Sequence, residues 1–237
     1  MKYYGVDGCR YRWIYIGIDE NDQYEFGVVT LFQELQQITN SASLILVDIP
    51  IGLREENPRE RLCDLKARKV LGNRRSSVFP PPSRLALGYD NYLEASELNF
   101  QNTGRRLSKQ SFAISKKIQE VDKFLTSTGL QSKYREMHPE ICFWALNNYE
   151  PMLYNKKKSD GLKERMSLLT KFFTNTNKLI EGTRSRYLRK DVALDDILDA
   201  LVGAVSARFK ENLKQLPEEP EIDDRGLKME IVYPAIQ

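Results

Sequence analysis

Histidine and cysteine are scarce in this sequence, and long apolar runs are absent from it. Its 237 residues include one histidine and three widely separated cysteines, Cys9, Cys63 and Cys142. An odd number of separated cysteines argues against a disulfide framework or a zinc site and favours a reducing compartment. No apolar run approaches the roughly 20 residues that span a bilayer, and no signal-peptide pattern follows Met1. We therefore expect a cytoplasmic protein without membrane contacts.

Glycine-rich phosphate loops are missing as well. The sequence contains neither a G-x-x-x-x-G-K-[ST] loop nor a G-x-G-x-x-G loop, which cradle nucleotide phosphates in other proteins. It also lacks the G-x-S-x-G turn that presents a nucleophilic serine. The sequence therefore gives no sign of a glycine-rich nucleotide loop or of a serine nucleophile on such a turn, and the candidate functional residues are chiefly carboxylates, the single histidine and arginines.

Basic charge is concentrated in the middle of the chain. The formal net charge is only +3, but between Arg54 and Lys123 there are 15 lysines and arginines against 9 aspartates and glutamates. A hydrophobic content of 41% and a charged content of 29% are ordinary for a globular protein. The length indicates one large domain, or one domain with an insertion.

The first 50 residues predict three strands, a helix and a fourth strand. The expected strands cover residues 3–6, 13–18, 24–30 and 43–48, and the expected helix covers 31–39. The fourth strand is almost entirely apolar, which is typical of parallel strands buried on both faces. It follows a helix, so a right-handed crossover would place it parallel to the first strand. With a fifth strand at 133–138, the sequence predicts an α/β fold with a mixed five-stranded sheet, three antiparallel strands followed by parallel ones, flanked by helices.

Residues 52–128 are polar, basic and mostly helical, with helices expected at 58–71, 91–98 and 108–125. They contain too few large apolar residues for a core of their own. We therefore expect a helical insertion within a single domain that covers residues 1–237. The remaining expected elements are helices at 140–147, at 162–173 and from an N-cap at Asp191 to Phe209, a break at 216–224 and a strand at 228–233.

Asp7 and Asp48 each close an apolar strand. Neighbouring strands lie about 4.8 Å apart, so at the carboxyl ends of two parallel strands these carboxylates would be close together. They would repel each other unless a cation sits between them, and ligands bind at this edge of open α/β sheets. The alternative is that both aspartates cap turns.

Asp196 and Asp199 lie three residues apart near the start of the late helix. Acidic residues there also favour the helix dipole, and a helical wheel places both away from the stripe of Leu194, Leu198 and Leu201, which is consistent with solvent exposure. Together with the strand-end aspartates, they provide the oxygen ligands that Mg²⁺ or Mn²⁺ requires. The sequence leaves open which of the two would bind the metal.

The only histidine lies in the segment Glu136-Met-His138-Pro-Glu140. Glu136 and His138 would share a strand face, and a histidine at a strand end could relay protons. A structural, hydrogen-bonded histidine is the alternative.

Arg74, Arg75 and Arg84 flank three consecutive prolines and Phe79. The prolines stiffen the backbone, and arginines beside an aromatic ring suit phosphate and base contacts. The alternatives are a solvated helical face and a proline-rich peptide ligand.

The order of the expected elements resembles the RNase H-like fold. In that fold, metal-binding carboxylates come from the first strand, the fourth strand and the last helix, which here implies Asp7, Asp48 and Asp196 or Asp199. The D-x-x-D-A-L pattern at 196–201 resembles Holliday-junction resolvases of this fold. More closely, the chain resembles a family of predicted RNase H-like nucleases, domain of unknown function 429. The matching segments are GVDGCR at 5–10, DIPIGL at 48–53, RRSSVFPPP at 74–82, HPE at 138–140 and DDILDA at 195–200.

The resemblance departs from many RNase H-like nucleases at the fourth strand, where they have glutamate and this chain has Asp48. Aspartate is one methylene shorter, so Glu136 on the fifth strand is a further candidate for that role.

These observations favour a metal-dependent nuclease that uses one or two Mg²⁺ or Mn²⁺ ions to hydrolyse phosphodiester bonds. The expected partner is a nucleic acid, DNA or RNA. The catalytic candidates are Asp7, Asp48, Asp196, Asp199, Glu136 and His138. The expected substrate contacts, all of which except Arg84 lie in the matching segments, are Arg10, Arg74, Arg75, Ser76, Ser77, Phe79 and Arg84.

Two other functions stay open at this point. Actin-like ATPases share the fold, but they need two copies of it. A non-catalytic module that binds nucleic acid or protein on the same core is the stronger alternative. A homodimer is equally left open by the sequence.

Overall fold

The computed structural model describes residues 1–236, so Gln237, the last residue of the expected domain, lies outside the described residues. The chain divides into two compact units. The first contains Met1–Asp48, Ser132–Lys214 and the residues from Val232 onward. The second contains Ile49–Gln131 and Gln215–Ile231, and so includes all of residues 52–128. Among residues 1–236, no helix is both long and apolar enough to cross a membrane.

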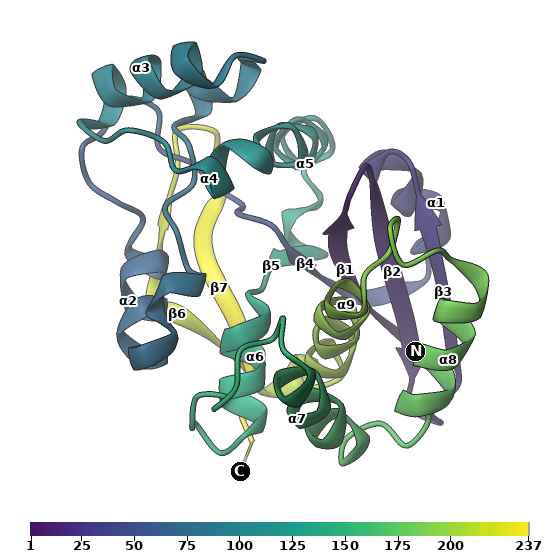
Figure 1. Ribbon diagram of the computed structural model, residues 1–237. Helices are drawn as coiled ribbons and strands as arrows, with labels where there is room; N and C mark the ends of the chain where they lie inside the picture. The colour runs from purple at the N-terminus through teal and green to yellow at the C-terminus, as the bar shows by residue number, and fades with distance from the viewer. Residues whose placement is uncertain (237) are drawn as a thin grey trace. The chain divides into compact units, whose positions relative to one another are not determined.

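The first unit is built on a mixed five-stranded sheet (Figure 1). The strands are β1 (Lys2–Cys9), β2 (Arg12–Asp19), β3 (Tyr24–Val29), β4 (Ala42–Asp48) and β5 (Tyr134–Glu136), in the spatial order β3-β2-β1-β4-β5. β2 pairs antiparallel with both β1 and β3, whereas β4 pairs parallel with both β1 and β5. The predicted α/β fold, with three antiparallel strands followed by parallel ones, is confirmed.

Helices flank this sheet (Figure 1). Those of the first unit are α1 (Leu35–Ile38), α6 (Pro139–Leu146), α7 (Ser159–Thr170), α8 (Thr176–Arg186) and α9 (Leu194–Ala207). The sequence did not predict α8, because its segment is polar and carries only a few apolar residues, of which Leu179 and Ile180 are buried. The helix expected at 31–39 is shorter in the structure, because its first turn, Phe32–Glu34, is a 3₁₀ helix.

The sheet has two apolar faces, because side chains alternate along each strand. On β1, Gly5 and Asp7 share the face that packs against α9 with Tyr3, which belongs to the buried cluster around that helix. The opposite face is covered by aromatic side chains, including Phe32, whose ring lies 4.9 Å from that of Trp13. Alternation therefore decides that Asp7 points to the α9 side of the sheet.

Two glycines let α9 approach β1 unusually closely. A Cβ added to Gly5 would lie 1.9 Å from the carbonyl oxygen of Ala200 and 2.3 Å from the backbone nitrogen of Ala204. From the other side, a Cβ on Gly203 would lie 3.0 Å from the Cα of Gly5. The backbones of the strand and the helix are thus in direct contact, which only residues without a side chain permit.

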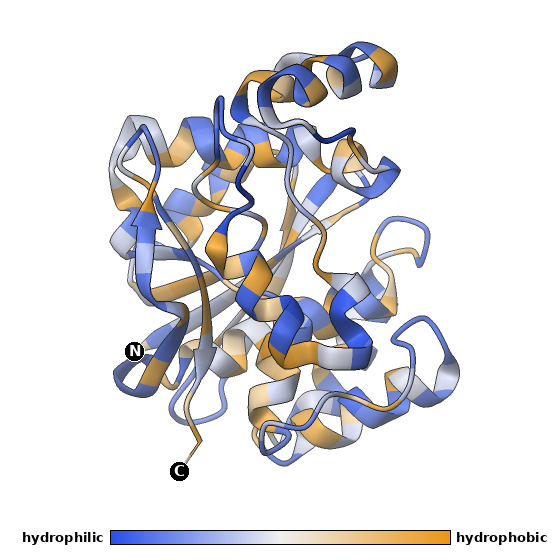
Figure 2. Ribbon diagram, turned by 90° about the vertical axis from the view of Figure 1, so that its left-hand side faces the viewer, coloured by the Kyte–Doolittle hydropathy of each residue, from blue (hydrophilic) through white to orange (hydrophobic). Residues whose placement is uncertain are grey.

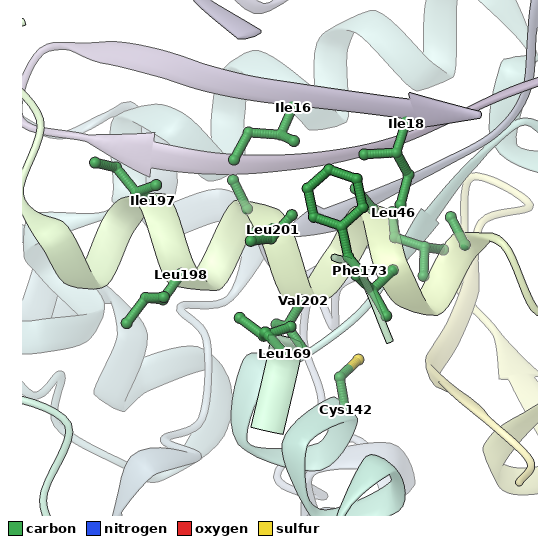
Figure 3. Close-up of a cluster of buried hydrophobic side chains, with 14 of the residues drawn as sticks. Ile16, Ile18, Leu46, Cys142, Leu169, Phe173, Ile197, Leu198, Leu201 and Val202 are labelled. Atoms are coloured by element: carbon green, nitrogen blue, oxygen red, sulfur yellow. The ribbon is translucent and has the colours of Figure 1, made fainter. Parts of the chain in front are cut away.

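α9 is buried on all sides from Ile197 to Ala207. Figure 3 shows β2 residues Ile16 and Ile18 on one side of the helix, and Leu169 of α7 and Cys142 of α6 on the other. The helical wheel was consistent with solvent exposure of Asp196 and Asp199. Because every residue from Ile197 to Ala207 is buried, no face of this part of α9 is exposed, and Asp199 is buried with the rest. The N-cap is Ala193 rather than the expected Asp191.

The second unit is mostly helical, as residues 52–128 predict. Its helices are α2 (Leu62–Leu71), α3 (Tyr92–Thr103), α4 (Lys109–Ala113) and α5 (Ser115–Thr128). In Figure 2, hydrophilic and hydrophobic residues alternate along the helices, which is the pattern of helices buried on one side.

A two-stranded ribbon follows α9, formed by β6 (Leu213–Ile222) and β7 (Lys228–Pro234). The break expected at 216–224 was therefore wrong, because most of that segment is strand. Pro217 and Pro220 suggested a break, but β6 pairs with β7 alone, and at the other edge of β6 a residue without an N–H costs no ladder hydrogen bond.

We predict that Gly5→Ala strongly destabilises the protein, because the added methyl group would overlap the backbone of α9. Overpacking of this kind typically costs about 1–3 kcal/mol, and here backbone rather than a flexible side chain must move. The measurement is the urea-induced unfolding free energy. Gly88→Ala is the control, since a Cβ there would meet its nearest neighbour at 3.7 Å. Equal stability of the two variants would contradict the close contact.

Candidate metal centre

Asp7 and Asp48 are direct neighbours in the parallel register of β1 and β4. Paired residues of adjacent strands point to the same face, and both carboxylates therefore lie on the α9 side. The Oδ1 atom of Asp7 accepts a hydrogen bond from the Gly8 N–H at 2.6 Å. Asp7 is 8% exposed, and Asp48 is partly buried.

Asp199 completes a group of three carboxylates. It lies on α9 one residue before Ala200, whose carbonyl is at the close contact with Gly5. One oxygen from each of Asp7, Asp48 and Asp199 lies within 4.8 Å of the other two. Asp199 is 3% exposed, so the second of the two late aspartates is the one that joins the strand-end pair.

Crowding and burial raise the pKa values of all three groups. Burial is the largest cause for each, and it raises the pKa of Asp48 to about 8 with further contributions from neighbouring carboxylates. Burial and the charges of Asp48 and Asp199 likewise raise the pKa of Asp7 well above its usual value. Without a compensating cation, the group therefore resists holding three negative charges.

One compensating charge comes from Lys156. Its Nζ atom lies 2.5 Å from Oδ2 of Asp199, and the charges of Asp199, Asp48 and Asp7 raise the pKa of this lysine. Lys156 therefore stays protonated and offsets part of the negative charge. The sequence did not single it out, because Asn155–Asp160 reads only as a charged loop.

A second buried ion pair lies near Asp199. Glu140 Oε1 accepts a hydrogen bond from Nη2 of Arg165 at 2.6 Å, and both residues are buried. Arg165 also donates to the carbonyl oxygens of Tyr154 and Gly161. The charge of Glu140 contributes to the raised pKa of Asp199, so this pair is part of the electrostatic surroundings of the acidic group.

The other predicted catalytic residues have different positions. Asp196 accepts a hydrogen bond from the Ala193 N–H at 2.9 Å and so caps α9. Glu136 pairs in register with Val47, which places its side chain on the opposite face of the sheet from Asp48. His138 directly precedes α6, and its carbonyl accepts the N–H groups of Ile141 and Cys142.

Most of the predicted substrate-binding residues belong to the second unit. Arg75 and Ser76 are exposed, while Arg74, Ser77 and Phe79 are partly buried. Ser77 donates its hydroxyl to the carbonyl of Arg74 at 2.9 Å. Arg10, in the first unit, is exposed, and its guanidinium lies 5.1 Å from the centre of the Tyr11 ring.

Arg84 differs from the other arginines, because it is buried at the centre of an ion-pair network. Its guanidinium contacts Asp122 at 3.0 Å and Glu55 at 3.1 Å, and it also pairs with Asp223. Its side chain is 3% exposed. Arg84 was expected to contact substrate. The structure corrects this expectation, because the buried guanidinium is paired with three carboxylates of its own unit.

The three grouped carboxylates fit a divalent cation such as Mg²⁺ or Mn²⁺. The donor set consists of carboxylate oxygens, which hard cations prefer. The Oδ1 atom of Asp199 is buried and makes no hydrogen bond within residues 1–236. A buried carboxylate oxygen without a partner is costly, and a cation bound to it would remove that cost.

The model of one family, Protein of unknown function (DUF429), matches residues 5–222. The chain belongs to this family. The match includes Asp7, Asp48 and Asp199 and all segments on which the sequence resemblance depends. Comparisons with curated proteins and with solved structures find no match.

We predict that this member of the DUF429 family loses stability between about pH 4 and pH 8 when metal is removed. The pKa of Asp48 is 3.8 before folding and about 8 in the folded chain, so folding takes up a proton in this range. The stabilisation is fully present below the lower value and disappears as the pH rises through the upper one. The measurement is the Tm in EDTA as a function of pH.

The charged groups that surround Asp48 are Asp7, Asp199, Asp196, Glu136 and Lys156. Asp48→Asn should reduce the pH dependence, because the amide does not titrate, while the raised pKa values of Asp7 and Asp199 account for the dependence that remains. The control is Asp160→Asn at an exposed position of α7, which should leave the slope unchanged. A Tm that is constant over this range in the unmodified protein would contradict the prediction.

For Arg84 we predict a structural effect. Arg84→Ala leaves Asp223 buried without its cationic partner and Asp122 with only the more distant Arg225 at 3.6 Å, and breaking a buried pair in this way typically costs about 3–5 kcal/mol. Arg75→Ala removes an exposed arginine and should change the unfolding free energy by no more than about 0.5 kcal/mol. Urea unfolding of both variants measures the difference, and comparable losses would show that the network contributes little.

Proposed function

We propose that the chain is a divalent-metal-dependent nuclease with an RNase H-like core, which hydrolyses phosphodiester bonds of DNA or RNA. The observation that carries this proposal is the group of Asp7, Asp48 and Asp199, whose oxygens lie within 4.8 Å of one another. Membership of the DUF429 family is compatible with it but names no activity.

The origin of the three carboxylates supports the RNase H-like assignment. They come from the first strand, the fourth strand and the last long helix, which are the elements that supply metal ligands in that fold. The order of elements, with β1, β2 and β3 followed by a helix and the parallel β4, agrees as well. Because unrelated activities share folds, this likeness supports the proposal without carrying it.

In this proposal, each carboxylate has a defined task. Asp7 and Asp48 provide ligand oxygens from neighbouring strands, and Asp199 provides its unpaired Oδ1 from α9. A bound Mg²⁺ or Mn²⁺ would supply Lewis acidity toward a phosphoryl oxygen. Asp196 holds the start of α9 through the Ala193 N–H and so positions Asp199. We do not assign Glu136 a ligand role, because it points to the other face.

Lys156 has a second task in the same proposal. In the structure, its ammonium group is paired with Asp199. When a divalent cation neutralises that carboxylate, the long lysine side chain can turn its charge toward a substrate phosphate. Arg10, Arg74 and Arg75 are the further candidates for backbone contacts with a nucleic acid.

A non-catalytic binding module is the second candidate function, and the Lys156–Asp199 pair favours it. An ammonium at 2.5 Å from Asp199 already neutralises one of the three carboxylates, as it would in a core that binds no metal. The two functions differ in their response to Mn²⁺, because only the nuclease needs the cation.

We predict that Asp7→Asn abolishes both Mn²⁺ binding and nuclease activity. The amide removes one anionic ligand, and the loss of an essential ligand should reduce activity by about two orders of magnitude or more. The measurement is isothermal titration with Mn²⁺ together with cleavage of single-stranded and double-stranded DNA and RNA. Asp160→Asn, which removes an exposed carboxylate of the same unit, should bind and cleave like the unmodified chain.

Three outcomes separate the candidates. Mn²⁺ binding and cleavage that both depend on Asp7 support the nuclease. Nucleic-acid binding without Mn²⁺ binding or cleavage supports the binding module. Equal cleavage by Asp7→Asn and by the unmodified chain would contradict the assignment of the acidic group as the catalytic metal site.

A further inference from the structure

The first unit contains a cavity of about 750 Å³ that is lined in part by Lys156, the lysine paired with Asp199. It lies between the start of α7, the end of α8 and the loop that leads into α9, and all its lining residues belong to the first unit. Its size is in the usual range for small-molecule sites, about 300–1,000 Å³. The nuclease proposed above does not by itself explain this cavity.

Positive charge dominates the lining. The basic residues are Lys156, Lys157, Lys163, Arg184 and Arg189. Among the described residues that line the cavity, Asp195 is the one carboxylate. Within residues 1–236, none of Lys157, Lys163, Arg184 and Arg189 forms an ion pair. Four cations without internal partners around one cavity favour an anionic ligand.

The cavity also has an apolar side. Leu162 and Met166 of α7 and Val192 of the loop line it together with Tyr187, a partly buried residue. Inorganic phosphate needs no such surface. A ligand that has both a phosphate and a flat apolar ring does, because aromatic side chains stack on nucleobases and arginines pair with phosphates.

One contact connects the cavity with the acidic group. Lys156 lines the cavity, and its Nζ lies 2.5 Å from Asp199. A ligand that contacts Lys156 in the cavity would therefore share this lysine with Asp199, one of the carboxylates that are proposed to hold the metal.

We infer that this cavity binds one nucleoside phosphate unit of the substrate, with the phosphate on the basic residues and the base against Tyr187 and the apolar residues. The inference rests on the proposed function, because it treats the bound nucleotide as part of the nuclease substrate. Two sources share the chemistry: a free nucleotide, and one nucleotide of a single strand. A double helix keeps its bases stacked and paired, so it cannot place one in the cavity without unstacking it.

The test measures binding separately from catalysis. AMP and a fluorescent single-stranded DNA 10-mer with a 5′-phosphate are titrated into the full chain in EDTA, by calorimetry and by fluorescence anisotropy. Arg184→Glu should weaken binding of the 10-mer by about tenfold or more, because it replaces a phosphate partner by a like charge. Lys178→Glu makes the same charge change on an exposed side chain of α8 outside the cavity and should leave affinity within about twofold.

Tyr187 provides the second arm of the test. Tyr187→Phe keeps a ring in the cavity and should retain the affinity, while Tyr187→Leu should reduce it. Near-equal Tm values of these variants and the unmodified chain show that the fold is kept. Equal weakening by Arg184→Glu and Lys178→Glu, or no binding of either probe, overturns the inference.

The outcomes distinguish this inference from the nuclease proposal. Cavity-dependent binding without any metal-dependent cleavage supports the nucleotide site and rejects the nuclease. Cleavage that depends on Asp7 but has the same KM in Arg184→Glu and Lys178→Glu supports the nuclease and rejects the site. Binding of AMP but not of the 10-mer supports the site and identifies the free nucleotide as its ligand.

Discussion

The backbone contact between β1 and α9 is the constraint on which the candidate site depends. Gly5 and Gly203 have no side chains to separate the strand from the helix, and Asp199 lies one turn before Gly203. Asp199 can therefore approach two strand-end aspartates that their register has already paired. With ordinary side chains at this contact, the helix would sit farther from the sheet and its carboxylate would leave the group.

The same closeness creates an electrostatic cost that the rest of the first unit offsets only in part. Burial and mutual repulsion raise the pKa values of Asp7, Asp48 and Asp199, and Lys156 supplies a single compensating charge. A divalent cation would supply more and would also satisfy the free oxygen of Asp199. If the proposed metal binds, Lys156 and the metal ion would compete for the same carboxylate, Asp199.

The sequence predicted the sheet well, because its signals are local and periodic. Apolar runs ending in Asp7 and Asp48 predicted both the strands and their parallel pairing. It could not choose between Asp196 and Asp199, because that choice depends on which helix face meets β1, and α9 is buried all round. Lys156 and the buried state of Arg84 were missed for a similar reason: a charged residue looks the same in sequence whether its partner is solvent or a distant carboxylate.

The parallel register of β1 and β4 has a consequence for how this site can vary. Side chains alternate between faces with every residue, so shifting β4 by a single position would turn Asp48 to the side of Phe32 and Trp13. No intermediate register exists between these two. The pairing of Asp7 with Asp48 is therefore either present or absent: small motions of the sheet leave it intact, and a one-residue shift of β4 between Leu44 and Asp48 eliminates it. An extra residue is tolerated only at the start of the strand, where the register already shifts between Ala42 and Leu44.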